Sequence, residues 1–165
     1  TYPVHRHITQ VQTVLCVTNK CRRVINDKLN THNASADAVF VKYDGNNEAA
    51  QDMHLWPGLV LHSCITDRKH LQNALRYMIK AVDKSKTALV KVNDTNEEIG
   101  QTFVLATSEV PAKLRLSYAI TIDNSQARTI YGNVRVIQTN HAHFSLRRLI
   151  VALGRVPDAS QLEVE

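Results

Sequence analysis

The segment 11–17, Val-Gln-Thr-Val-Leu-Cys-Val, constrains the fold more than any other part of the sequence. A short run this apolar suits a β-strand buried on both faces, as strands of parallel sheets are. Thr18 and Asn19 end the run, and residues 20–29 then carry apolar side chains at helical spacing, with Asn19 as the expected N-cap. A strand, a polar turn and a helix in this order predict an α/β fold around a parallel sheet.

Further short strands and one more helix are expected along the rest of the chain. Alternating or β-rich patterns predict strands at 38–43, 59–65, 77–82, 87–92, 102–109, 114–117, 133–138 and 161–164. Helical spacing predicts a helix over 145–153, with Ser145 as a candidate cap. The segment 46–54 is compatible with a loop or one helical turn, and 118–125 with a strand or a helix. The four strands after the turn at 56–58 predict a small antiparallel barrel or ribbon inserted into the α/β core.

The composition is that of a folded chain of one domain, or of one core with a small insertion. Of the 165 residues, 44% are apolar and 21% are charged, which excludes a disordered chain. No apolar run approaches the roughly 20 residues needed to cross a bilayer, so no membrane partner is expected. The net charge of +5 permits binding to nucleic acid but does not establish it.

The cysteines predict an intracellular protein without a metal site. Cys16, Cys21 and Cys64 are odd in number and form no Cys-x-x-Cys pair, which is typical of reduced thiols in the cytoplasm or nucleus. Cys16 lies in the apolar run and is expected to pack in the core. Residues 1–7 lack the apolar stretch of a signal peptide, so secretion is not expected. No Cys and His residues have the spacing of zinc ligands, and no bound metal is expected.

Thr18 and Asn19 form the first candidate phosphate contact. A strand that stops there and opens a helix leaves free backbone N–H groups, which bind phosphate through hydrogen bonds and the helix dipole. The two side chains add polar groups at the same place. The alternative is an ordinary helix cap.

A second polar cluster follows the apolar segment that contains Thr121. Ser125, Gln126 and Thr129 place several hydrogen-bonding side chains close together in the sequence. Such a cluster can hold a nucleic-acid backbone or a nucleotide phosphate. The alternative is a polar turn without a ligand.

Arg155 follows the helix predicted over 145–153. A guanidinium is always charged and can form two parallel hydrogen bonds, so at this position it suits a phosphoryl group in transfer. The alternative is a surface arginine at a helix C-terminus, where the helix dipole favours a positive charge.

These segments resemble the motifs of superfamily 1 helicases. Residues 118–129 (Tyr-Ala-Ile-Thr-Ile-Asp-Asn-Ser-Gln-Ala-Arg-Thr) are similar to the family pattern Ala-Ile-Thr-x-x-x-Ser-Gln-Gly-x-Thr, and 149–156 (Leu-Ile-Val-Ala-Leu-Gly-Arg-Val) to Val-Ala-Leu-Ser-Arg-Val. Residues 14–26 resemble the helicase segment with Thr-Asn and a later Asn. Leu-Trp-Pro-Gly at 55–58 and Leu-Gln-Asn-Ala at 71–74 resemble the SH3-like insertion of the RecD-like branch.

The resemblance covers 11–162 and implies the C-terminal, second RecA-like domain of such a helicase. The implied fold is a mostly parallel sheet flanked by helices, formed by 1–54 and 110–165, with a β-rich SH3-like insertion at 55–109. The parent protein would couple ATP hydrolysis to translocation on single-stranded nucleic acid, DNA in preference to RNA. It would serve in the replication of a virus or mobile element.

The resemblance also implies roles for the candidate residues. Arg155 would be the catalytic arginine finger that stabilises charge on the γ-phosphate, and Gln126 would line the nucleotide cleft beside it. The contacts to the nucleic-acid strand would come from Thr18, Asn19, Thr121, Ser125 and Thr129.

Part of the machinery of such a helicase is absent from this sequence. There is no Gly-x-x-x-x-Gly-Lys-[Ser/Thr] loop and no acidic pair after a strand. The family has these in a first RecA-like domain, which would bind ATP and magnesium in the full-length protein and would be a partner of this chain. The chain alone is expected to bind neither and not to hydrolyse ATP.

The chain departs from the helicase motifs at several positions. Asp123-Asn124 replaces the usual His-Lys, Ala127 and Ala74 replace glycines, and Gly154 replaces Ser. The loss of two cationic positions should weaken phosphate contact. Two alternatives therefore stay open. One is a catalytically inactive helicase-like scaffold in a replication complex, and the other is a plain nucleic-acid-binding module.

Overall fold

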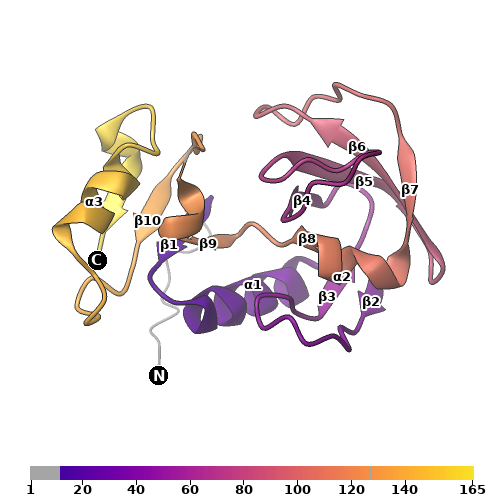
Figure 1. Ribbon diagram of the computed structural model, residues 1–165, viewed down its shortest axis with the longest axis horizontal. Helices are drawn as coiled ribbons and strands as arrows, with labels where there is room; N and C mark the ends of the chain where they lie inside the picture. Colours follow the sequence, from indigo (N-terminus) through magenta and orange to yellow (C-terminus); the bar gives the residue numbers. More distant parts are fainter. Residues whose placement is uncertain (1–11, 127) are drawn as a thin grey trace. The chain divides into compact units, whose positions relative to one another are not determined.

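The computed structural model describes residues 12–126 and 128–165, which form two compact units (Figure 1). The first unit contains residues up to 25 together with 118–165, and the second contains 26–117. Ala127, Val11 and the segment 1–7, which entered the expectations above, lie outside the described residues. The boundaries expected for the insertion, 55–109, stay a prediction.

The first unit is built on a four-stranded parallel sheet, which confirms the expected α/β core. Its strands β1 (Thr13–Cys16), β9 (Ala119–Thr121), β10 (Val134–Val136) and β11 (Leu162–Val164) lie in the order β11-β10-β1-β9. Val14 pairs with Ala119 on one side of β1 and with Arg135 on the other. The most apolar segment of the sequence is thus an inner strand, where both faces are buried.

Two helices follow strands of this sheet, as predicted. α1 (Asn19–Asn33) begins after β1, and α3 (Leu146–Leu153) lies between β10 and β11 along the chain. Ser145 caps α3 as expected, because its side chain accepts a hydrogen bond from the Arg148 N–H. The prediction that Asn19 is the N-cap of α1 is wrong. Asn19 already belongs to the helix, and Thr18 Oγ1 accepts a hydrogen bond of 3.2 Å from the Cys21 N–H.

The segment that was compatible with a strand or a helix contains both. The β-branched residues around Ile120 form β9, and a single 3₁₀ turn, η3 (Asp123–Ser125), follows at once. A second 3₁₀ turn, η4 (Ala159–Gln161), precedes β11. The chain therefore changes from extended to helical backbone after Thr121, and Gln126 follows the end of the 3₁₀ turn.

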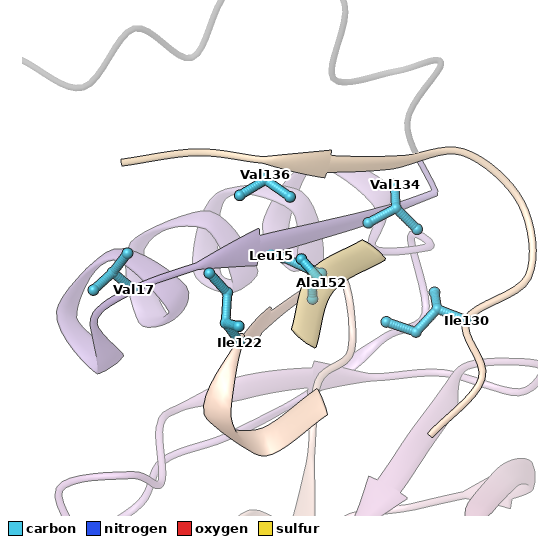
Figure 2. Packing of buried hydrophobic residues seen from close by; sticks show 7 residues of the cluster. All are labelled: Leu15, Val17, Ile122, Ile130, Val134, Val136 and Ala152. Carbon is cyan, nitrogen blue, oxygen red and sulfur yellow. The ribbon is translucent and has the colours of Figure 1, made fainter. Parts of the chain in front are cut away.

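The hydrophobic core of the first unit joins α3 to the sheet (Figure 2). It consists of Leu15, Val17, Ile122, Ile130, Val134, Val136 and Ala152. Burying one such aliphatic side chain stabilises a protein by roughly 1.5–3 kcal/mol. Because Ala152 lies near the end of α3, this packing also fixes the position of the residues that follow the helix.

The second unit consists mainly of antiparallel strands, as the sequence indicates for the middle of the chain. One sheet has the order β7-β6-β5-β4-β8. Its strands are β4 (Val60–Ser63), β5 (Arg76–Val82), β6 (Lys86–Val92), β7 (Phe103–Ala106) and β8 (Leu114–Arg115). The turn η2 (Thr107–Glu109) and the short helix α2 (Val110–Lys113) connect β7 to β8.

A small hairpin of the second unit was missed in the sequence. β2 (Val39–Val41) pairs with β3 (Met53–Leu55), although 46–54 was expected to be a loop or a helical turn. Three residues are too few for a recognisable alternation, so the pairing with β2 decides their structure. No helix of the described residues is long and apolar enough to cross a membrane.

Candidate functional site

The carboxyl ends of the parallel strands bring the candidate segments of the first unit to one edge of the sheet. Thr18 follows β1, the segment 122–126 follows β9, and Gln138 follows β10. The Ile122 N–H donates to the Cys16 carbonyl at 2.9 Å, which ties the first two segments together. Open α/β sheets bind their ligands beyond this edge. The strand order therefore assembles a candidate site from distant parts of the chain.

At the start of α1, the side chain of Thr18 is engaged within the protein. Its Oγ1 accepts from the Cys21 N–H and donates to Gln138 Oε1 at 3.4 Å. Asn19 is exposed, and its Oδ1 accepts a hydrogen bond of 3.2 Å from Arg22 Nε. Arg22 therefore orients the Asn19 amide, whereas the Thr18 hydroxyl mainly shapes the backbone.

In the turn after β9, two of the candidate hydroxyls also serve the backbone. Thr121 Oγ1 accepts from the Asn124 N–H at 3.3 Å. Ser125 is completely buried, and its Oγ donates to the Ile122 carbonyl at 2.6 Å. Of the candidate residues around this turn, Gln126 and Thr129 are exposed, as are the neighbouring Asp123 and Asn124. The turn thus holds a fixed shape, and Gln126 and Thr129 are the candidate residues that it presents to solvent.

Asp123 forms a two-pronged ion pair with Arg148 of α3. The distances are 3.2 Å from Nε to Oδ1 and 2.7 Å from Nη2 to Oδ2. The hydrogen bonds from Arg148 hold the pKa of the Asp123 carboxyl below its usual value. Sequence reasoning treated Asp123 as a lost positive charge and missed its partner, since no local pattern indicates that α3 lies beside this turn.

Arg155 links the end of α3 to the chain that follows the Ser-Gln turn. Its Nε donates to the Val151 carbonyl at 3.1 Å and its Nη1 to the Arg128 carbonyl at 3.4 Å. The Arg155 carbonyl accepts from the Ile130 N–H at 2.7 Å. The two segments that resemble helicase motifs therefore lie beside each other, and the Arg155 guanidinium donates to backbone carbonyls.

Arg128 is a further cation in this region that the sequence analysis did not single out. Burial lowers the pKa of its guanidinium. Its Nε is buried and has no hydrogen-bond partner among the described residues. Arg128 occupies the variable position of the Ser-Gln motif, so the motif by itself contains no signal for it.

Gln138 is the second residue that the sequence analysis missed. Its Oε1 accepts hydrogen bonds from the Val17 N–H at 3.0 Å and the Thr18 N–H at 3.2 Å. Its backbone has φ 63, a left-handed conformation that is uncommon for residues other than glycine. Only the pairing of β10 with β1 brings this side chain to the start of α1.

The cysteines of the first unit belong to its interior. Cys16 and Cys21 are both buried, so the expectation that Cys16 packs in the core is confirmed. A hydrogen bond with Cys21 and burial raise the pKa of the Cys16 thiol. No group of three His, Cys, Asp or Glu residues suited to a metal ion occurs in 12–126 and 128–165.

Comparison with solved structures defines the class of fold. No family model and no curated protein sequence matches the chain. It superposes on the Pif1 helicase of Candida albicans with a TM-score of 0.64 and 16% identity, over 93% of this chain and 45% of that one. For Bacteroides Pif1 in complex with ADP-AlF3 and ssDNA, the TM-score is 0.61 and the identity 18%, over 93% of this chain and 40% of that one.

A third structure comes from a study of two coordinating Pif1 helicases at forked dsDNA. It matches with a TM-score of 0.66 and 18% sequence identity, over 94% of this chain and 38% of that one. The chain thus has a helicase-like α/β fold with a RecA-like parallel sheet. In particular, its fold is that of one part of the Pif1 helicases, since it spans less than half the length of these chains.

Proposed function

We propose that the chain is the second RecA-like domain of a superfamily 1 helicase of the RecD-like branch. The full-length protein would use ATP hydrolysis to translocate on single-stranded DNA, inside the cell and in the replication of a virus or mobile element. One observation carries the proposal: Arg155 and the segment after the Ser-Gln turn are joined by hydrogen bonds, so the two helicase-like motifs lie beside each other in the first unit.

The residues of this chain suit one side of a nucleotide cleft. ATP with magnesium, held by the first RecA-like domain, would supply the phosphoryl group. Arg155 would stabilise negative charge there, and exposed Gln126 would line the cleft beside it. To do so, the guanidinium leaves two neutral carbonyl acceptors for anionic oxygens, which accept stronger hydrogen bonds. The buried charge of Arg128 adds positive potential on the same side.

The residues proposed to contact the nucleic-acid strand divide into two kinds. Asn19 and Thr129 are exposed and would bind phosphates directly. Thr18, Thr121 and Ser125 would act by holding the backbone, because their hydroxyls already form hydrogen bonds within the chain. Cationic groups of the same unit would add the salt-dependent part of the affinity.

The decisive experiment is the substitution Arg155→Ala in the full-length protein. We expect DNA-stimulated ATP hydrolysis to fall by about a thousandfold or more, with thermal unfolding close to that of the parent. Arg135→Ala is the matched control, because it removes an arginine of the same sheet that pairs with Glu163. An unchanged rate in Arg155→Ala would refute the finger role.

An inactive helicase-like scaffold is the second candidate, and the Asp123–Arg148 pair favours it. An acid stands where the related helicases have a cation, and it engages one of the nearby arginines. Single-strand binding without any DNA-stimulated ATP hydrolysis in the full-length protein would establish the scaffold. Single-strand binding that no nucleotide alters would instead indicate a plain binding module.

A further inference from the structure

The end of β10 supports the start of α1 through one side chain, that of Gln138. Beyond Cys16, the backbone N–H groups of Val17 and Thr18 have left the sheet. Both donate to Gln138 Oε1, at 3.0 and 3.2 Å, and the Thr18 hydroxyl adds a third hydrogen bond at 3.4 Å. One amide oxygen thus receives three donors from two consecutive residues.

The backbone of Gln138 indicates that this arrangement is strongly determined. Its φ of 63 lies in the left-handed region, which L-residues avoid at a cost of about 1–2 kcal/mol. The following His141 N–H donates to its carbonyl at 3.0 Å, so the reversed backbone also closes a turn. Such strain persists only where the surrounding contacts compensate it.

The same contacts fix the residues that follow. Thr18 Oγ1 accepts from the Cys21 N–H while it donates to Gln138, so the first turn of α1 is held from both sides. Asn19 comes next, exposed and oriented by Arg22. The position of the Asn19 amide therefore depends on Gln138 through Thr18.

We propose that Gln138 is a positioning residue for single-stranded DNA, acting through Thr18 on Asn19. This inference rests on the proposed function. The Gln138 amide oxygen occupies the N–H groups ahead of α1, so a backbone phosphate binds beside them, at Asn19, rather than over the helix start. The Gln138 side chain thereby determines where the DNA strand lies along this edge of the β-sheet.

The test compares variants that tolerate the left-handed backbone. Gln138→Gly removes the amide without backbone strain, and Gln138→Asn keeps an amide that is one methylene too short to reach the Val17 N–H. Gln101→Gly, at an exposed position of the second unit, is the control. The probe is a labelled oligothymidylate, titrated into the full-length protein while ATP hydrolysis is followed.

We expect Gln138→Gly and Gln138→Asn to raise the DNA concentration for half-maximal stimulation about tenfold, which corresponds to the net contribution of roughly one hydrogen bond, because the side chain acts on DNA only indirectly. The maximal rate at saturating DNA should stay unchanged, a division that a general loss of structure would not produce. Thr18→Ala should add little in the Gln138→Gly background, because both changes release the same segment.

Hydrogen exchange of the Val17 and Thr18 amides tests the positioning role of Gln138 separately from the proposed helicase function. Faster exchange in Gln138→Gly together with weaker binding of oligothymidylate supports the inference. Faster exchange in a protein whose parent form binds no oligothymidylate shows that Gln138 holds the start of α1 but overturns its role toward DNA, together with the proposed function. Unchanged exchange overturns the inference whatever the binding shows. Tighter DNA binding by Gln138→Gly would also overturn it, because the amide oxygen would then be a competitor of phosphate.

Discussion

Asp123, in the turn after β9, and Arg148, in the first half of α3, are joined by two hydrogen bonds of 3.2 and 2.7 Å. The pair connects the Ser-Gln turn to the helix that leads to Arg155. Superfamily 1 helicases usually have a cation where this chain has Asp123. In this chain the Asp123 carboxylate instead forms a contact that is internal to the first unit.

Asp123→His with Asn124→Lys, which restores the usual residues, should strengthen single-strand binding. The change adds positive charge and releases Arg148. The slope of log affinity against log salt concentration should therefore become more negative by about one or two. Thermal stability should fall by at most about 1 kcal/mol, because exposed ion pairs contribute little. Fluorescence anisotropy at several salt concentrations measures the slope. A slope equal to that of the parent would show that this turn lies away from the DNA.

The carboxylate of Asp67 should make the second unit sensitive to acid. It accepts hydrogen bonds from the N–H groups of Lys69, His70 and Leu71, and these lower its pKa to about 2. Because the pKa is lowered by folding, the contribution to stability is complete above about pH 4. It is lost as the pH falls toward 2. Unfolding followed at pH 5 and pH 2.5 measures this difference.

Asp67→Asn is the control for that acid sensitivity. Asparagine keeps one acceptor oxygen but does not titrate, so the variant should lose less stability between the two pH values than the parent does. An equal loss in both proteins would assign the acid sensitivity to other carboxylates. An NMR titration of the Asp67 carboxyl carbon reads the pKa directly.

Ala74→Gly should stabilise the protein. Ala74 has φ 69 and follows Asn73, at the position that is glycine in the helicase insertions which this segment resembles. Relief of about 1–2 kcal/mol of backbone strain exceeds the roughly 0.5–1 kcal/mol that glycine costs through the unfolded chain. The net gain should be a few tenths of a kcal/mol to about 1 kcal/mol, measured by urea unfolding. Ala88→Gly in β6, where the backbone is extended, should destabilise the protein instead. A loss of stability in both variants would contradict the backbone strain inferred at Ala74.

Local patterns predicted much of the fold, and the exceptions have a common cause. The apolar run at β1, the helical spacing of α3 and the Ser145 cap each depend on neighbouring residues alone. The cap of α1 was misassigned because Thr18 and Asn19 are both good capping residues, and only the hydrogen bond to Cys21 distinguishes them. β3 was missed because it is a strand only beside β2.

The order and spacing of motifs in the sequence determined the helicase-like resemblance and the candidate residues Gln126 and Arg155. The tertiary structure alone decided which groups these residues meet. Gln138 reaches Thr18 across 120 positions of sequence, and Arg155 reaches Arg128 across 27. Such contacts depend on which strands become neighbours in the sheet, and strand order follows from burial over the whole chain rather than from any local pattern.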